Sequence, residues 1–168
     1  METENKNLTI YPIIYAHIII TSVLIYGIII PLINMSGIKD ETLDLFKNYY
    51  IDNKYKSLIL DFFIIYFIIK LAEKSPSKFP KIFSRILCIL IFDTFLTIYI
   101  HKTSWDQGTI HFLRNWIRKL GLIALIWDII YMNLTANLAD KINNISFFKN
   151  QYIKLMINMF IIIFLLHV

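Results

Sequence analysis

Residues 10–33, with the sequence IYPIIYAHIIITSVLIYGIIIPLI, decide the fold of this chain. The stretch has no Asp, Glu, Lys or Arg, and only His17 ionises near neutral pH. A helix needs about 20 mostly apolar residues to cross the hydrocarbon core of a bilayer. Pro31 lies near the end of the stretch, where it disturbs a helix least. The stretch lacks a basic segment before it and a small-residue cleavage pattern, so we expect a retained membrane anchor.

The composition of the whole chain favours a membrane location. Of its 168 residues, 57% are hydrophobic and 17% are charged, whereas a soluble domain is typically about 45–50% apolar and about 25% charged. A water-soluble fold of this size could not hide so much apolar surface, and the bilayer is the solvent that explains it. We therefore treat residues 1–168 as a single membrane domain.

Four further segments approach the length needed for a crossing, and they lie at residues 57–71, 82–100, 120–138 and 152–168. The segment 57–71 is short, and 152–168 either crosses the bilayer or lies in its interface. Only helices and closed barrels satisfy their backbone groups in lipid, and these runs are too long for barrel strands. The predicted fold is an all-α integral membrane helical bundle of four to five transmembrane helices, with one or two interfacial amphipathic helices.

The two predicted amphipathic helices are residues 40–51 and 108–120. In the first, Leu43, Phe46 and Tyr50 recur at helical spacing. In the second, apolar residues around Trp116 share one face, and the other face carries His111, Arg114, Arg118 and Lys119. That pattern is typical of a helix lying among lipid headgroups, with Gly121 as a hinge into the next crossing. A straight extension of that crossing into water is an equal alternative.

The net charge of +5 bears on the partners. In a membrane protein, basic segments more often meet anionic headgroups than nucleic acid. We therefore expect the lipid bilayer as the partner, with anionic headgroups at His111, Arg114, Arg118 and Lys119, and no nucleic acid. The basic loop at residues 73–81 predicts a cytoplasmic N-terminus and, with five crossings, a C-terminus outside.

A short pattern, Leu-Ile-x-Asp, occurs three times and ends at Asp61, Asp93 and Asp128. An aspartate at the middle of a bilayer costs roughly 2.5–3.5 kcal/mol on insertion scales. Such residues usually face the interior of a bundle, pair with another group or line a wet path. Asp93 and Asp128 fall near the middle of their segments, and Asp61 falls near the start of its own.

Other polar residues at helical spacing extend this predicted polar interior. Asp93, Thr97 and His101 are four residues apart, and such residues share a helix face. The full set of candidates is Asp61, Asp93, Thr97, His101, Asp128, Tyr131, Thr135 and His17. The alternative is that these residues only hold helices together, since polar contacts between membrane helices average about 0.6 kcal/mol each.

Motifs for catalysis and for cofactors are absent from the sequence. It contains no G-x-G-x-x-G, no Walker A motif, no H-E-x-x-H and no G-x-S-x-G. Its one cysteine, Cys88, cannot form an intrachain disulfide. We therefore predict no catalytic residues, no metal site and no cofactor.

The segments Ile91-Phe92-Asp93-Thr94-Phe95 and Trp127-Asp128-Ile129-Ile130-Tyr131 each place an aspartate within an aromatic-rich helix. In these two segments the chain resembles uncharacterised small multi-pass membrane proteins of large DNA viruses and some bacteria. The resemblance implies a multi-pass membrane protein and no particular activity.

The sequence leaves three functional hypotheses. The first is a small proton or cation transport or channel-like protein that uses the intramembrane aspartates and forms a homo-oligomer to enclose a pathway. The second is a structural or scaffolding protein of a viral or organellar membrane, whose buried acids only support helix packing. The third is a lipid-modifying membrane enzyme, which the lack of a motif disfavours.

Overall fold

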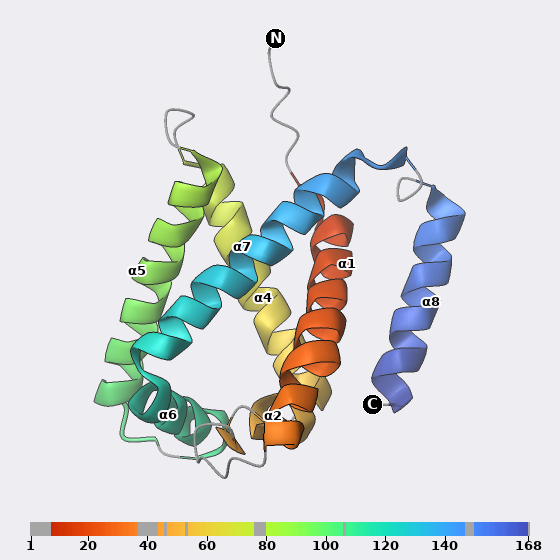
Figure 1. Cartoon of the computed structure of the whole chain (residues 1–168). Helices are drawn as coiled ribbons and strands as arrows, with labels where there is room; N and C mark the ends of the chain where they lie inside the picture. Colours follow the sequence, from red (N-terminus) through yellow and green to blue (C-terminus); the bar gives the residue numbers. More distant parts are fainter. Residues whose placement is uncertain are drawn as a thin grey trace.

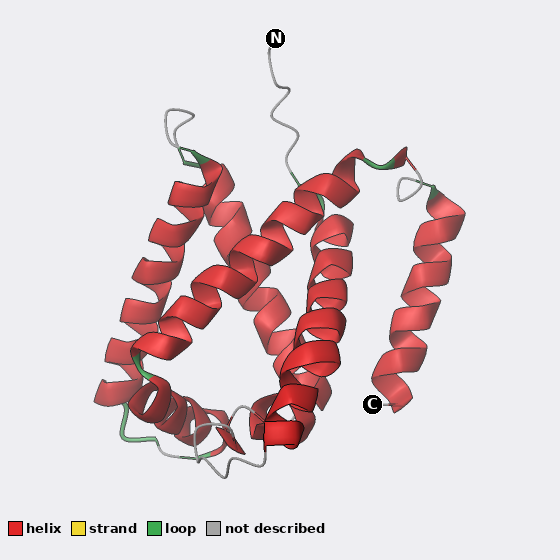
Figure 2. Cartoon of the chain, in the orientation of Figure 1, coloured by secondary structure: helices red, strands yellow, loops and turns green. Residues whose placement is uncertain are grey.

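The computed structural model describes residues 8–36, 44–45, 47–52, 54–75, 80–105, 107–146 and 150–167. Among these residues every regular element is a helix and none is a strand (Figure 2). The elements are α1 (Ile10–Ile20), η1 (Thr21–Ile29), α2 (Ile30–Ser36), η2 (Asn48–Asp52), α4 (Lys54–Glu73), α5 (Lys81–Lys102), α6 (Gly108–Leu120), α7 (Leu122–Asn144) and α8 (Gln151–His167). The predicted all-α class is confirmed.

Three of the described helices are long and apolar enough to cross a membrane, which is compatible with a membrane-embedded protein. They are Ile10–Met35, Lys81–Lys102 and Leu122–Asn144. This number is lower than the four to five crossings that we predicted. The predicted segment 57–71 lies within α4, which carries Lys54, Lys56, Asp61, Lys70 and Glu73. The predicted segment 152–168 corresponds to α8, which has only 17 residues.

The first long helix is built from α1, η1 and α2 without a break between them. Its middle part, η1, is a π-helical stretch that ends two residues before Pro31. Proline has no N–H to donate, and its ring crowds the carbonyl group four residues earlier. The wider π-helical turns therefore lie next to the residue that disturbs the regular α-helical bonding.

The long helices form a bundle in which α1 packs along α7 and α4 packs along α5 (Figure 1). Its core is mainly aliphatic and includes Ile13, Ile65, Ile89 and Ala136, all fully buried. The helix α8 stands beside the bundle, and the ammonium group of Lys154 lies 5.4 Å from the centre of the Tyr11 ring.

Figure 1 places the start of α1, the end of α4 and the start of α5 at one end of the bundle. The last turn of α8 lies at the other end. The assignment of the first end to the cytoplasm stays a prediction.

The helix α6 crosses the lower end of the bundle in Figure 1 and has the predicted bounds. It meets α7 at Gly121, whose φ of 49° and ψ of −118° suit glycine and almost no other residue. The chain turns there, so the alternative of a straight extension of α7 is wrong. Trp116 and Leu120 pack against Ala124 of α7, and the apolar face of α6 therefore covers the bundle.

Only part of the predicted amphipathic helix at 40–51 can be compared. Leu43 and Phe46 lie outside the described residues, whereas Asn48–Asp52 form η2. Tyr50, on the predicted apolar face, is only 2% exposed.

Candidate functional site: a cavity lined by three aspartates

A cavity of about 600 Å³ lies between α4, α5, α6, α7 and η2. Asp61 of α4, Asp93 of α5 and Asp128 of α7 all line it. The three aspartates of the repeated sequence pattern therefore come together at one place, each from a different helix.

Helix geometry explains why these three residues meet. The start of α4, the end of α5 and the start of α7 lie at the same end of the bundle (Figure 1). Asp61 is seven residues from that end, Asp128 six and Asp93 nine. At 1.5 Å per residue, all three lie roughly 9–14 Å in from the helix ends. Asp61 is about as deep as Asp128, because α4 begins at Lys54 and adds a turn ahead of the predicted segment.

The carboxylates are only partly satisfied by the surrounding protein. The Tyr49 hydroxyl donates to Oδ1 of Asp61. Burial raises the pKa of Tyr49, so this phenol keeps its proton and acts as a donor. The Oδ2 atoms of Asp61 and Asp93 are buried, and no described residue forms a hydrogen bond with them. Among the described residues that line the cavity, none is Lys, Arg or His. A buried carboxylate oxygen without a donor is costly, so the cavity favours a ligand that supplies positive charge or a proton.

Aromatic rings form one wall of the cavity beside Asp61. The ring of Tyr49 stacks on Phe112, with centroids 5.2 Å apart and planes at 14°. Trp116 lies 5.4 Å from Tyr49 and 5.6 Å from Phe112. We call Tyr49, Phe112 and Trp116 the aromatic wall. It joins η2 to α6 and carries the hydroxyl group that binds Asp61.

Some of the predicted polar residues lie at the cavity and others do not. Thr97 lines it together with the three aspartates. His101 is exposed in the last turn of α5, and its Nδ1 atom lies 2.9 Å from the Thr97 carbonyl oxygen. Thr135 is buried and donates to the Tyr131 carbonyl oxygen one turn earlier in α7.

His17 and Tyr131 belong to a separate buried network. His17 Nε2 lies 2.9 Å from the carbonyl oxygen of Leu58, which can only accept, so this nitrogen carries a proton and donates. The Tyr131 hydroxyl lies 3.1 Å from Nδ1 of the same ring and also bonds the Thr21 hydroxyl. The network joins α1, α4 and α7 with its polar atoms satisfied, which is the role of hydrogen-bonding contacts between helices.

The predicted headgroup-binding residues on α6 also differ in their surroundings. Arg114 donates from one guanidinium nitrogen to three carbonyl oxygens at or just after the end of α5, those of Ile100, Thr103 and Trp105. These contacts satisfy carbonyl groups left open at a helix C-terminus. His111 pairs with Asn115 at 2.9 Å, and Arg118 and Lys119 are exposed. Arg114 therefore has a structural partner, and the lipid contact of the other residues stays a prediction.

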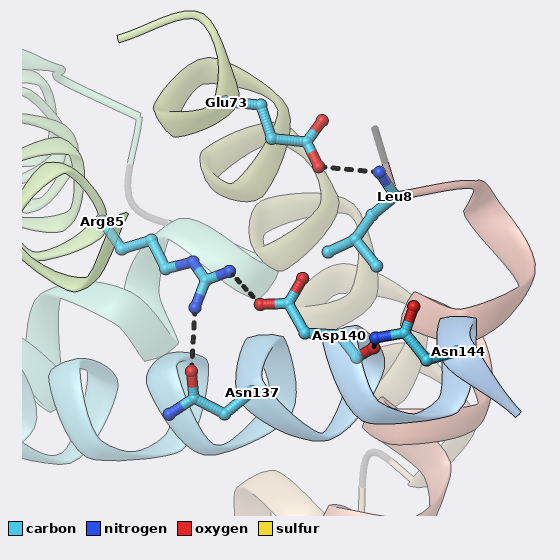
Figure 3. Close-up of polar contacts among 6 residues, drawn as sticks. All are labelled: Leu8, Glu73, Arg85, Asn137, Asp140 and Asn144. Atoms are coloured by element: carbon cyan, nitrogen blue, oxygen red, sulfur yellow. Dashed lines mark hydrogen bonds and ion pairs between the residues drawn. The ribbon is translucent and has the colours of Figure 1, made fainter. Parts of the chain in front are cut away.

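Sequence reasoning missed an ion pair between a buried arginine and a partly exposed aspartate near the opposite end of the bundle (Figure 3). Arg85 of α5, 4% exposed, donates to Asp140 Oδ2 at 2.8 Å and to Asn137 Oδ1 at 3.0 Å. In the same region Glu73 accepts from the backbone N–H of Leu8 at 2.9 Å. The sequence contained an indication of this pair, because an arginine within an apolar helix requires a partner.

The arrangement at the cavity suits binding of a single positive charge more than metal chelation. The described His, Cys, Asp and Glu side chains form no group of three placed to hold one metal ion. Comparison of the chain with protein-family models, with curated proteins and with solved structures finds no match.

Proposed function

We propose that this chain is a multi-pass integral membrane protein that binds and transfers a cation or proton at the three-aspartate cavity. The observation that carries the proposal is the convergence of Asp61, Asp93 and Asp128 from three helices on one cavity without a basic residue among its described lining. Acids that served only as packing contacts would be expected to end at donors on neighbouring helices.

The proposal includes α4 as a further crossing. This helix has 20 residues and so spans about 30 Å, the thickness of the hydrocarbon core. Its charged residues Lys54, Lys56, Lys70 and Glu73 fall in its terminal turns. From there the long side chains of Lys56 and Lys70 reach the interface. Lys70 and Glu73 form an ion pair at 2.8 Å. The helix α8 supplies a fifth crossing or lies in the interface.

The proposal is tested by flux through vesicles that contain the purified protein. Protons, potassium and tetraethylammonium are measured separately for the wild type and for a variant with Asp93→Asn and Asp128→Asn. We expect flux of at least one of them in the wild type and its loss in the variant. The matched control is Asp44→Asn, because Asp44 is exposed and outside the cavity. Equal flux in both proteins, or none in either, contradicts the proposal.

A structural or scaffolding role is the second candidate, and the contacts of His17 and Arg85 favour it. Both residues use buried polar groups to join helices, with no cavity involved. For this role we expect that neutralising Arg118 and Lys119 weakens attachment to anionic vesicles or assembly, while Asp→Asn changes alter stability alone. Unchanged attachment and assembly after both neutralisations count against it.

A further inference from the structure

Three features of the cavity together fit an organic cation better than a simple metal ion or a proton. It has a volume of about 600 Å³, within the range of about 300–1,000 Å³ usual for organic ligands. Carboxylates lie at Asp61, Asp93 and Asp128, and the aromatic wall stands beside the first of them. Ammonium groups bind to aromatic ring faces as well as to carboxylates. The lining therefore matches an organic cation in size, charge and surface.

The mouth of the cavity can be located from the exposure of its lining residues. Leu90 and Ile98 of α5 are 37% and 46% exposed, and Leu122 of α7 is 69% exposed. All three line the cavity, so its mouth lies between α5 and α7. The exposed residues on the same two helices include Phe95 and Ile126, which are also apolar. In a membrane this surface faces lipid, so the mouth opens sideways toward the acyl chains.

A ligand that enters through such a mouth must be soluble in the bilayer, whereas the carboxylates inside select a positive charge. We propose that the cavity binds an amphiphilic organic cation, with its ammonium head between the aspartates and the aromatic wall and its apolar tail leaving between α5 and α7. This inference rests on the proposed function, because it names the class of cation that the same cavity takes.

The buried atoms of the site give a reason for the affinity. The Oδ2 atoms of Asp61 and Asp93 lack donors among the residues that the structure describes. A bound ammonium compensates them electrostatically in surroundings of low dielectric constant, where such attraction is stronger than in water. The tail adds buried apolar area at the mouth. Head and tail should thus both contribute, and removing either should weaken binding.

The test is calorimetric titration of the full chain in phosphatidylcholine nanodiscs, with the heat of partition into empty nanodiscs subtracted. The probe is dodecyltrimethylammonium, compared with dodecyl sulfate, which has the same tail and the opposite charge, and with tetramethylammonium, which has the head alone. We expect saturable binding of dodecyltrimethylammonium, at least about tenfold tighter than either comparison compound. Equal affinity for dodecyl sulfate would show that the cavity binds apolar tails without selecting a positive charge, and would overturn the inference.

Two sets of variants locate the site. Asp61→Asn and Asp128→Asn should each weaken binding about tenfold, while Asp44→Asn leaves it unchanged. Ile98→Trp should fill the mouth and weaken binding, whereas Ile91→Trp should not, since Ile91 has the same 46% exposure on the same helix but does not line the cavity. Equal effects of the two tryptophan variants would overturn the lateral mouth.

The two proposals fail in different ways. Potassium or proton flux that depends on the aspartates, without binding of dodecyltrimethylammonium, overturns the inference and leaves the proposed function standing. Binding of the amphiphile through the aspartates, without any flux that depends on them, supports the inference about the ligand and overturns transfer across the membrane.

Discussion

Arg85 near one end of the bundle and the three cavity aspartates nearer the other are charged groups that apolar helices carry into the interior. Arg85 donates hydrogen bonds to Asp140 and Asn137, both on α7 and both within 3.0 Å (Figure 3). The aspartates line a cavity. Asp61 accepts hydrogen bonds from the side chains of Tyr49 and Tyr50, whereas Oδ2 of Asp93 has no partner among the described residues.

The difference separates two uses of buried charge. A charge that is paired within the protein fixes how helices pack, and breaking such a pair is costly. A buried charge without a partner in the protein lowers the stability of the fold. Such a charge is useful only when a ligand or a proton neutralises it. We therefore expect the Arg85 region to govern stability and the cavity to govern function.

The largest expected effect on stability comes from Arg85→Leu. The change removes two hydrogen bonds of the guanidinium group and leaves Asp140, whose side chain is 34% exposed, without its cation. It should lower the free energy of unfolding by on the order of 3 kcal/mol, since hydrogen bonds to charged groups contribute about 1.5–3 kcal/mol each. Denaturation in detergent micelles, followed by helical circular dichroism, measures it. Arg118→Leu is the control, because Arg118 is exposed. Similar losses of stability in the two variants would show that the Arg85–Asp140 ion pair does not stabilise the bundle.

A smaller loss is expected for Gly121→Ala, which tests the turn that holds α6 across the cavity. The φ of 49° at Gly121 strains any residue with a Cβ atom, at a cost of about 2 kcal/mol. Gly27→Ala is the control, since Gly27 lies within η1 without a positive φ, and a methyl group there meets the Ser22 carbonyl oxygen at 3.4 Å. If both alanine variants unfold alike, α6 is not fixed by this turn.

Tyr131→Phe should cost about 1 kcal/mol, since it removes one hydroxyl group from the network of His17 and Thr21. The same denaturation measurement applies. Tyr99→Phe, at a tyrosine that is 56% exposed, should have no effect. A variant as stable as the wild type would mean that this network does not hold α1 to α7.

The smallest effect, and the sharpest contrast with Arg85→Leu, is expected for Asp128→Asn. Replacing an open carboxylate by a neutral amide should leave stability unchanged or raise it by up to about 1 kcal/mol. The measurement is the same, with Asp44→Asn as the control. A loss above about 2 kcal/mol would show that Asp128 supports helix packing, as the structural hypothesis requires.

Local sequence patterns predicted the helices well. The bounds of α6 and the turn at Gly121 followed from amphipathic spacing and from the glycine itself. The predicted fourth crossing ended at residue 138, whereas α7 continues to Asn144. Asp140 lies in the added turns and pairs with Arg85, and a search for apolar runs cannot recognise such a helix end.

The candidate site could be predicted only in part. The cost of an intramembrane acid singled out Asp61, Asp93 and Asp128 one at a time. Their convergence depends on the rotation of three helices, which no single helix sequence contains. Tyr49 was missed because it lies outside the apolar segments, and His101 was included because spacing along α5 does not reveal where the helix leaves the bundle.

The most direct test of the central claim is labelling of the reconstituted protein with an apolar carbodiimide, read residue by residue by mass spectrometry. This reagent adds to protonated carboxyl groups in apolar surroundings. We expect adducts at the cavity aspartates and a marked reduction of them when dodecyltrimethylammonium or a transported cation is added. We expect no adduct at Asp140, which is paired with Arg85. Labelling of Asp140 with none in the cavity, or cavity labelling that no cation reduces, would contradict the central claim.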